Sequence, residues 1–141
     1  MTKATSVENG TSAAVRKDES MEIQKRMLAE HAERLSKAKE EGKKVVYTFV
    51  PGNLTELITA AGALPVYPEI NALQSGMRNL SADYIQEAEK LGHSEDVCTY
   101  VKCDVGMMLK GNVGPTGVKL PEPDLLLLSY TGCFVFMKWF E

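Results

Sequence analysis

The chain has 141 residues, of which 44% are hydrophobic and 25% are charged, and its formal net charge is -3. This size and apolar fraction suit one soluble domain with a packed core. A nucleic acid or an anionic membrane surface needs a basic stripe to neutralise phosphate. The net charge therefore does not indicate a nucleic acid or a membrane as a partner.

The ends of the chain and its cysteines indicate a cytoplasmic protein. Residues 1–20 contain no apolar core of the kind that a secretory signal requires. The longest uncharged stretch near the end, 125–137, has 13 residues, fewer than the ~20 of a membrane-spanning helix. Without an export signal, the three cysteines favour reduced thiols or metal ligands over disulfides.

Two segments precede the first predicted strand. Residues 1–19 are polar and lack periodicity, which predicts a disordered tail. Residues 20–42 predict a charged helix that ends at Gly42. One apolar stripe runs along it, made of Met21, Leu28, Ala32 and Leu35. We expect this stripe to pack, and we expect His31 to be a solvated surface residue.

Residues 43–67 predict a strand, a short helix and a second strand. The run 43–50 (KKVVYTFV) is β-branched and aromatic. Asn53 suits the N-cap of the following helix, with Glu56 as the reciprocal partner of a capping box. Residues 63–67 form the second predicted strand. This βαβ unit implies a parallel sheet.

The rest of the chain continues the alternation of helices and strands. Ser81 is predicted to cap a helix to about 91, and Ser94 a helix to about 109. Residues 111–123 carry the Gly and Pro signals of a loop. The apolar run 124–129 predicts a strand buried on both faces, and a new helix begins at 133.

The element order predicts an α/β fold: an incomplete parallel sheet of the doubly wound type, preceded by an N-terminal helix. The last predicted strand needs cover on both faces, and the helix that should supply part of this cover has only begun at Glu141. We therefore expect the chain to be an excerpt of a longer α/β protein.

Two cysteines are candidates for a metal site. Cys98 lies in the first turn of a predicted helix, and Cys133 lies between a predicted strand and helix, where ligands gather in parallel sheets. Helix N-termini also stabilise thiolates. Cys103 points ~140° away from Cys98 on a regular helix, so we expect a buried thiol there. Because no C-x-x-C spacing is present, the residues alone fit core thiols as well as ligands.

Polar residues follow the first two predicted strands. Thr48, Asn53, Glu69 and Asn71 lie near the carboxyl ends of these strands, where they could meet a substrate. Capping by Asn53 and turn formation by 69–71 explain the same residues without a substrate. We carry Thr48, Glu69 and Asn71 forward as substrate-pocket candidates.

Four stretches together resemble one family: KVVYTFVPGNLTEL, LPVYPEINALQSGMR, AEKLGHSEDVCTYVKCDVGMM and PDLLLLSYTGCFVFMKWFE. Over residues 20–141 the chain resembles the benzoyl-CoA reductase and 2-hydroxyacyl-CoA dehydratase family, in particular the B-type cluster-bearing subunit of the class I reductases. The family's chains are much longer. The resemblance thus implies that residues 43–141 are the N-terminal part of a dehydratase-like α/β domain.

The resemblance implies a [4Fe-4S] cluster held by Cys98 and Cys133, with a further ligand beyond Glu141. It implies that the complete enzyme reduces benzoyl-CoA to a cyclic dienoyl-CoA with electrons from ferredoxin. The implied partners are a homologous cluster-bearing subunit and activator subunits that hydrolyse ATP, which this chain does not bind. Two alternatives stay open: a 2-hydroxyacyl-CoA dehydratase subunit, or an inactive fragment that only docks on a partner.

Overall fold

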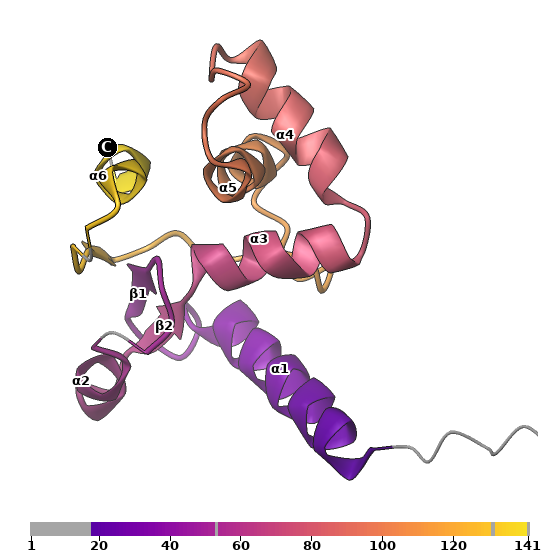
Figure 1. Ribbon diagram of the computed structural model, residues 1–141. Helices are drawn as coiled ribbons and strands as arrows, with labels where there is room; N and C mark the ends of the chain where they lie inside the picture. The colour runs from indigo at the N-terminus through magenta and orange to yellow at the C-terminus, as the bar shows by residue number, and fades with distance from the viewer. Residues whose placement is uncertain (1–17, 53, 131, 141) are drawn as a thin grey trace, which may run out of the picture.

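The computed structural model describes residues 18–52, 54–130 and 132–140. Helices and strands alternate along these residues (Figure 1). In chain order the elements are α1 (Glu19–Lys37), β1 (Val45–Thr48), α2 (Thr55–Ala60), β2 (Leu64–Val66), α3 (Pro68–Met77), α4 (Ser81–Lys90), α5 (Thr99–Leu109), β3 (Leu125–Leu127) and α6 (Phe134–Phe140).

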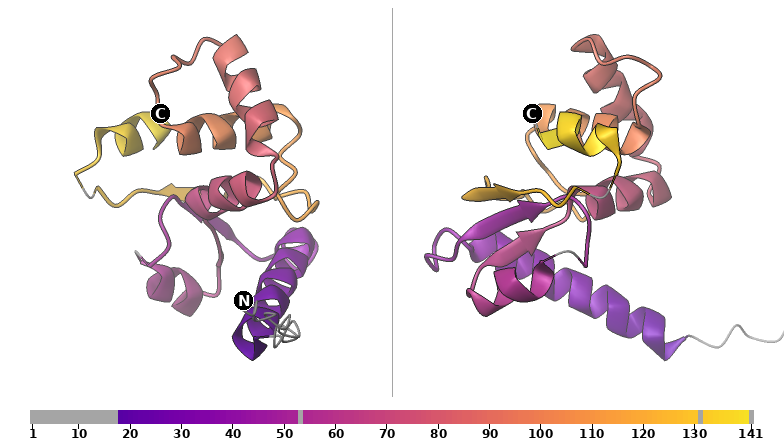
Figure 2. Two further views of the ribbon diagram at one scale, coloured as in Figure 1. Left: turned by 45° about the vertical axis from the view of Figure 1, so that its right-hand side comes forward. Right: turned by 60° about the vertical axis from the view of Figure 1, so that its left-hand side comes forward.

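The three strands form a parallel sheet in the order β2-β1-β3. In the views of Figure 1 and Figure 2, α1 and α2 lie to one side of the strands, and α4, α5 and α6 lie to the other. From β1 the chain moves first to one neighbour and later to the other, which is the arrangement that creates a switch point in doubly wound sheets. The predicted α/β class, with a helix before a parallel sheet, is confirmed.

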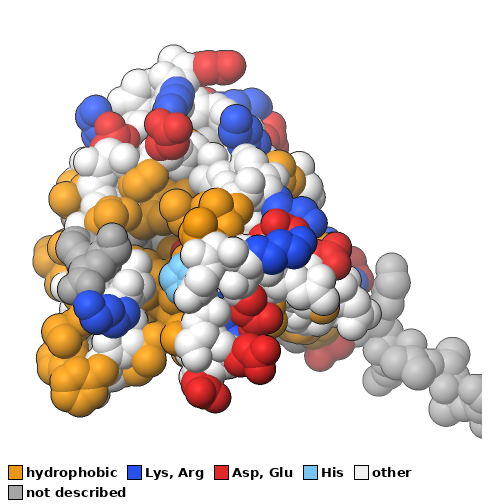
Figure 3. Space-filling model, turned by 90° about the horizontal axis from the view of Figure 1, so that it is seen from above, with side chains coloured by type: hydrophobic (Ala, Val, Ile, Leu, Met, Phe, Trp, Pro, Cys, Tyr) orange, Lys and Arg blue, Asp and Glu red, His pale blue; other side chains and the backbone are white. Residues whose placement is uncertain are grey.

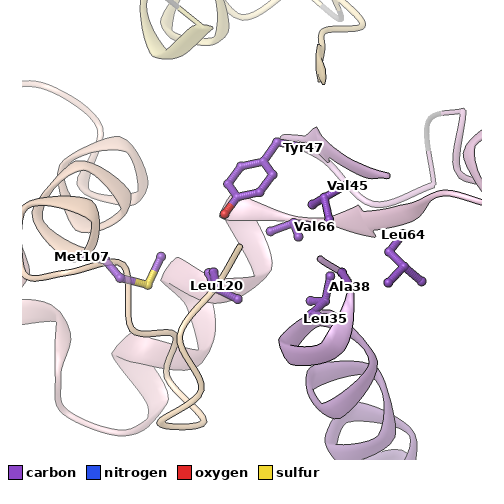
Figure 4. Close-up of a cluster of buried hydrophobic side chains, with 8 residues drawn as sticks. All are labelled: Leu35, Ala38, Val45, Tyr47, Leu64, Val66, Met107 and Leu120. Carbon is purple, nitrogen blue, oxygen red and sulfur yellow. The ribbon is translucent and has the colours of Figure 1, made fainter. Parts of the chain in front are cut away.

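The core lies where α1, the sheet and α5 meet. All four residues of β1 are buried, as their β-branched and aromatic side chains predict. The core cluster draws on α1 and its end, β1, β2, α5 and the loop before β3 (Figure 4): Leu35, Ala38, Val45, Tyr47, Leu64, Val66, Met107 and Leu120. Tyr47 also donates a hydrogen bond from Oη to the carbonyl of Pro121 at 2.9 Å, so its buried hydroxyl is satisfied.

The N-terminal helix begins and ends at other residues than expected. Asp18 is its N-cap and accepts a hydrogen bond from the Ser20 amide at 3.0 Å. The helix ends at Lys37, and 38–42 form turns that close with Gly42 in the left-handed region. A disordered tail is predicted for residues 1–19, and residues 1–17 of it lie outside the described residues. Of the predicted stripe, Leu35 is the member that is buried.

The prediction that His31 is solvated is wrong. His31 is half-buried, and its Nε2 lies 2.9 Å from the carbonyl oxygen of Pro65 in β2. Pro65 has no N–H and its carbonyl is already bonded, so this outer edge of the sheet offers little to a further strand. Burial is the main cause that lowers the pKa of His31 below its ordinary value of 6.5.

We predict that His31 makes stability sensitive to acid. Because its pKa is lower in the folded chain than in the unfolded chain, the unfolded state binds more protons as pH falls below about 6.5. Stability is therefore full above that pH and decreases as pH falls through the folded pKa. His31→Gln, which keeps a donor for the Pro65 carbonyl, should flatten this dependence in urea unfolding between pH 7.5 and 5. An unchanged slope would show that His31 does not contribute to it.

The segments around α2 and α3 differ from the prediction in their ends. The N-cap of α2 is Leu54, with φ 60° and no side-chain cap, while the predicted cap Asn53 lies outside the described residues. After β2 the chain enters α3 directly at Pro68, whose fixed φ suits the first turn of a helix. Glu69 and Asn71 thus lie on a helix and not in the expected turn.

Two predictions near the C-terminal half are also corrected. The helix expected from 94 begins only at Thr99, because the Ser94 hydroxyl accepts the Asp96 amide at 3.2 Å in a local turn. The strand β3 is not buried on both faces: Leu125 is 54% exposed and Leu126 is 39% exposed. The reason is that β3 is an edge strand, paired only with β1 among the described residues.

No helix within 18–52, 54–130 and 132–140 has both the length and the apolar character needed to cross a membrane.

Candidate functional site

The ends of β1 and β3 meet at the switch point of the sheet. A small hollow lies there, too tight to admit a water molecule, and its lining residues are Thr48, Phe49, Val50, Leu128, Ser129 and Phe136. Phe136 belongs to α6, so α6 lies against this edge. Sites in open α/β sheets form at this kind of position, which makes the β1–β3 edge the candidate site.

An aromatic cluster joins α6 to the end of β1. The ring centroid of Phe49 lies 4.9 Å from that of Trp139 and 6.5 Å from that of Phe136. The rings of Phe136 and Trp139 are nearly parallel, at 12°. Tilted and offset pairs at these distances are attractive. The cluster therefore supplies an apolar wall beside the switch point.

A buried carboxylate anchors the same helix to α5. The indole Nε1 of Trp139 donates to Oδ2 of Asp104 at 2.8 Å, and Asp104 is 4% exposed. Burial raises the pKa of Asp104 to about 6, against the opposing effect of the Trp139 hydrogen bond. The sequence did not predict Asp104 or its pairing with Trp139, since no local pattern indicates a bond between residues so far apart.

The three cysteines have different surroundings. Cys98 is the N-cap of α5 and is half-buried, whereas Cys133 directly precedes α6 and is exposed. Cys103 is buried, with its Sγ 4.0 Å from the carbonyl of Ala72, and burial raises the pKa of its thiol. The buried position predicted for Cys103 agrees with the structure, and a raised pKa disfavours the thiolate that metals bind.

The two candidate ligands lie on segments that contact the same helix. Cys98 is the residue directly before α5, and Cys133 is the residue directly before α6. The helix α6 contacts α5 through Trp139, which lies near the C-terminal end of α6. Figure 2 shows α5 and α6 as neighbours above the sheet. Within the described residues, no group of three or more His, Cys, Asp or Glu side chains is arranged to hold a metal ion.

The donor chemistry fits an iron–sulfur cluster only in part. Such clusters commonly take thiolate ligands, and four of them in the simplest case. Cys98 and Cys133 are thiols of suitable exposure, but they supply at most two of these ligands. They fit as a partial set of donors that residues outside this chain would have to complete.

The substrate-pocket candidates divide between two places. Thr48 lines the hollow at the switch point and is buried. The Glu69 amide donates to the carbonyl of Phe49 at 3.2 Å, which brings the start of α3 to the same edge. Asn71 lies further along α3 and lines a larger groove, and its buried Nδ2 has no hydrogen-bond partner in the described structure.

That larger groove, of about 730 Å³, was not predicted. It runs between α1, β2 and α3, and apolar side chains of α1 form one wall: Ile23, Met27, Leu28 and Leu35. The spacing of these residues is the sequence signal that indicates the wall. Further hydrophobic side chains gather at the surface seen in Figure 3. Leu91, which follows α4, and Phe134 and Met137 of α6 are among the exposed apolar residues.

An α/β domain with a switch point of this kind is shared by many proteins, and comparison with known families identifies the class. The chain belongs to the 2-hydroxyglutaryl-CoA dehydratase D-component family, whose model matches residues 47–141. The family resemblance of the sequence is thereby confirmed.

Three relatives show where in the family the chain lies. It is 59% identical over 131 residues to the B subunit of benzoyl-CoA reductase of Thauera aromatica, a match that covers 93% of this chain and 30% of that protein. It is 32% identical over 117 residues to the (R)-2-hydroxyisocaproyl-CoA dehydratase alpha subunit of Clostridioides difficile. That match covers 82% of this chain and 28% of the dehydratase subunit.

The third relative is the (R)-phenyllactyl-CoA dehydratase alpha subunit of Clostridium sporogenes, 32% identical over 105 residues, which are 74% of this chain and 25% of that protein. The chain spans less than a third of the length of the relatives it matches. These relatives are subunits of enzymes that act on CoA thioesters, as their names state.

Proposed function

We propose that this chain is part of the B-type, cluster-bearing subunit of a benzoyl-CoA reductase. The 59% identity to the B subunit of benzoyl-CoA reductase over 131 residues carries the proposal, because it far exceeds the 32% identity to the two dehydratase subunits. The reaction adds two electrons and two protons to the aromatic ring of benzoyl-CoA. The product is a cyclic dienoyl-CoA.

In this proposal Cys98 and Cys133 are two ligands of a [4Fe-4S] cluster, and the other ligands come from residues outside these 141. When bound, such a cluster transfers single electrons at low potential. The position of both thiols at the starts of helices supports the assignment, since helix N-termini favour anionic groups.

The residues of this chain bind and shield the substrate. Thr48 at the end of β1 and Glu69 at the start of α3 contact the acyl-CoA from the candidate site. Asn71, two residues after Glu69, contributes its unpaired Nδ2 from the side of the larger groove. The aromatic cluster of Phe49, Phe136 and Trp139 keeps water from this edge. Exclusion of water matters because it strengthens every electrostatic interaction in the site.

The proposed enzyme is a cytoplasmic complex. A homologous cluster-bearing subunit completes the catalytic pair, and activator subunits couple ATP hydrolysis to electron transfer from ferredoxin. The names of the relatives, which are subunits of larger enzymes, support a need for partners. Exposed apolar side chains on α6 and β3 are consistent with burial against further protein.

The second candidate is a subunit of a 2-hydroxyacyl-CoA dehydratase, which the family match and the 32% identities favour. One experiment distinguishes the two candidate functions. The full-length subunit is expressed with its partners and assayed anaerobically with benzoyl-CoA and with a 2-hydroxyacyl-CoA. We expect ATP-dependent consumption of benzoyl-CoA only. Turnover of the hydroxyacyl-CoA alone would assign the dehydratase, and turnover of neither would favour a docking role.

The cysteine assignment predicts a distinct pattern of iron loss. In the full-length subunit, Cys98→Ser and Cys133→Ser should each lower bound iron and sulfide by well over half, because a cluster with a missing thiolate is labile. Cys103→Ser is the matched control and should keep its iron, since this thiol is buried and its Sγ faces the carbonyl of Ala72 in α3. Full iron content in both ligand variants, measured after anaerobic purification, contradicts the assignment.

A further inference from the structure

The helix α5 carries two buried charged side chains that the proposed function leaves without a role. Lys102 is 2% exposed and Asp104 is 4% exposed. Charged side chains are rarely buried this far unless they are paired, because removing a charge from water is costly. Each of these two contacts a different segment of the chain, and each of those segments carries one candidate cysteine.

Lys102 holds the loop between α4 and α5. Its Nζ donates to Oε1 of Glu89 at 2.7 Å and to the carbonyl oxygen of Glu95 at 2.8 Å. One ammonium group thus ties α4 and the loop 91–98 to α5. The same residue's amide donates to the carbonyl of Cys98 at 3.2 Å, so the loop is fixed just before and at this cysteine.

Asp104 holds the segment that follows β3. It lies two residues after Lys102, which places the two side chains about 200° apart around the helix. Its carboxylate accepts the indole N–H of Trp139 at 2.8 Å and thereby fixes α6, which begins directly after Cys133. The Phe49 ring, 4.9 Å from that of Trp139, restrains α6 from the sheet side.

We propose that Lys102 and Asp104 are positioning residues: from opposite sides of α5 they set the separation of the segments that carry Cys98 and Cys133. The inference rests on the proposed function, since it is the role of the two thiols as ligands that makes their separation matter. A cluster demands ligands at defined places, and side chains fixed by buried hydrogen bonds supply such order before a cofactor binds.

The test measures the separation of the two cysteines without any cluster. Nitroxide labels on Cys98 and Cys133, in a Cys103→Ser background of this chain, give a distance distribution by pulsed electron paramagnetic resonance. We expect Lys102→Met and Asp104→Leu each to broaden this distribution roughly twofold, since each breaks a buried polar anchor. Glu89→Gln and Asp104→Asn, which keep an acceptor oxygen, should leave it narrow.

Two controls separate positioning from general stability. Lys90→Met removes an exposed ion pair of similar length, Lys90–Glu87 at 2.8 Å, and should not broaden the distribution. Leu35→Ala removes a core side chain of α1 and leaves the hydrogen bonds of both anchors in place, so it should lower Tm without broadening the distribution. For variants that fold too poorly to label, the alkylation rate of Cys98 in unlabelled chain is compared instead, and Lys102→Met should raise it several-fold.

The outcomes are distinct from those that test the proposed function. Narrow distributions and unchanged alkylation in Lys102→Met and Asp104→Leu would overturn the positioning role, whatever cofactor the full-length protein holds. A second outcome is broadening in those variants while the full-length Cys98→Ser and Cys133→Ser variants keep their full iron content. It would show that Lys102 and Asp104 position the two segments, but that the two cysteines do not bind a cluster.

Discussion

Replacing Gly106 by alanine should destabilise the chain by more than about 3 kcal/mol, because the new methyl group has no space. A Cβ at this position of α5 would lie 1.8 Å from the carbonyl oxygen of Tyr84 in α4, and 2.4 Å from its carbonyl carbon. These are backbone atoms, which cannot turn aside as a side chain can. The two helices would have to separate, and Met107 beside Gly106 belongs to the core.

Gly76 is the matched control. It also lies within a helix, α3, but a Cβ there meets nothing within 4 Å. Gly76→Ala should therefore stabilise the chain by about 0.5–1 kcal/mol through better helix propensity and a less flexible unfolded state. Urea unfolding followed by circular dichroism compares the two variants. Equal and small effects would show that α4 and α5 are not as close as the structure places them.

Replacing Asp104 by asparagine should stabilise the chain at neutral pH. The pKa of Asp104 is raised from 3.8 to about 6 in the folded chain, so between these values the folded state binds more protons than the unfolded state. Stability therefore falls as pH rises through this window, by up to about 3 kcal/mol for such a difference in pKa. Asparagine is neutral and keeps an oxygen for the Trp139 N–H.

The pH profile provides the internal control for this prediction. At pH 3 the carboxyl group is protonated in both states, and Asp104→Asn should have little effect on the free energy of unfolding. The gain should appear between pH 4 and 6 and stay constant above about pH 7. His31 acts in the opposite direction, since its lowered pKa makes stability fall in acid. A gain for Asp104→Asn that does not change with pH would disprove the buried-carboxylate explanation.

The local elements followed from residue types and spacing. The β-branched run of β1, the short helix and the strand β2 form where the sequence predicts them, because burial of alternating or continuous apolar residues decides strands and helices locally. The α/β class and the parallel sheet follow from that alternation. For the site, the sequence indicated the edge after β1 and the buried state of Cys103.

Helix ends were less well predicted, because competing local hydrogen bonds decide them. Ser94 bonds the Asp96 amide and delays α5 until Thr99, which turns Cys98 from a first-turn residue into the N-cap. The helix α3 was missed because its first residue, Pro68, is also a common turn residue.

By itself, the sequence determined the fold class, the order of the elements and, through its resemblance, the family. Only the tertiary structure decided that His31 reaches the Pro65 carbonyl, that Trp139 bonds Asp104 and that Lys102 joins α4 to the loop before Cys98. These contacts join residues distant along the chain. Their energies depend on burial and on the alignment of partners, which exist only once the helices have packed on the sheet.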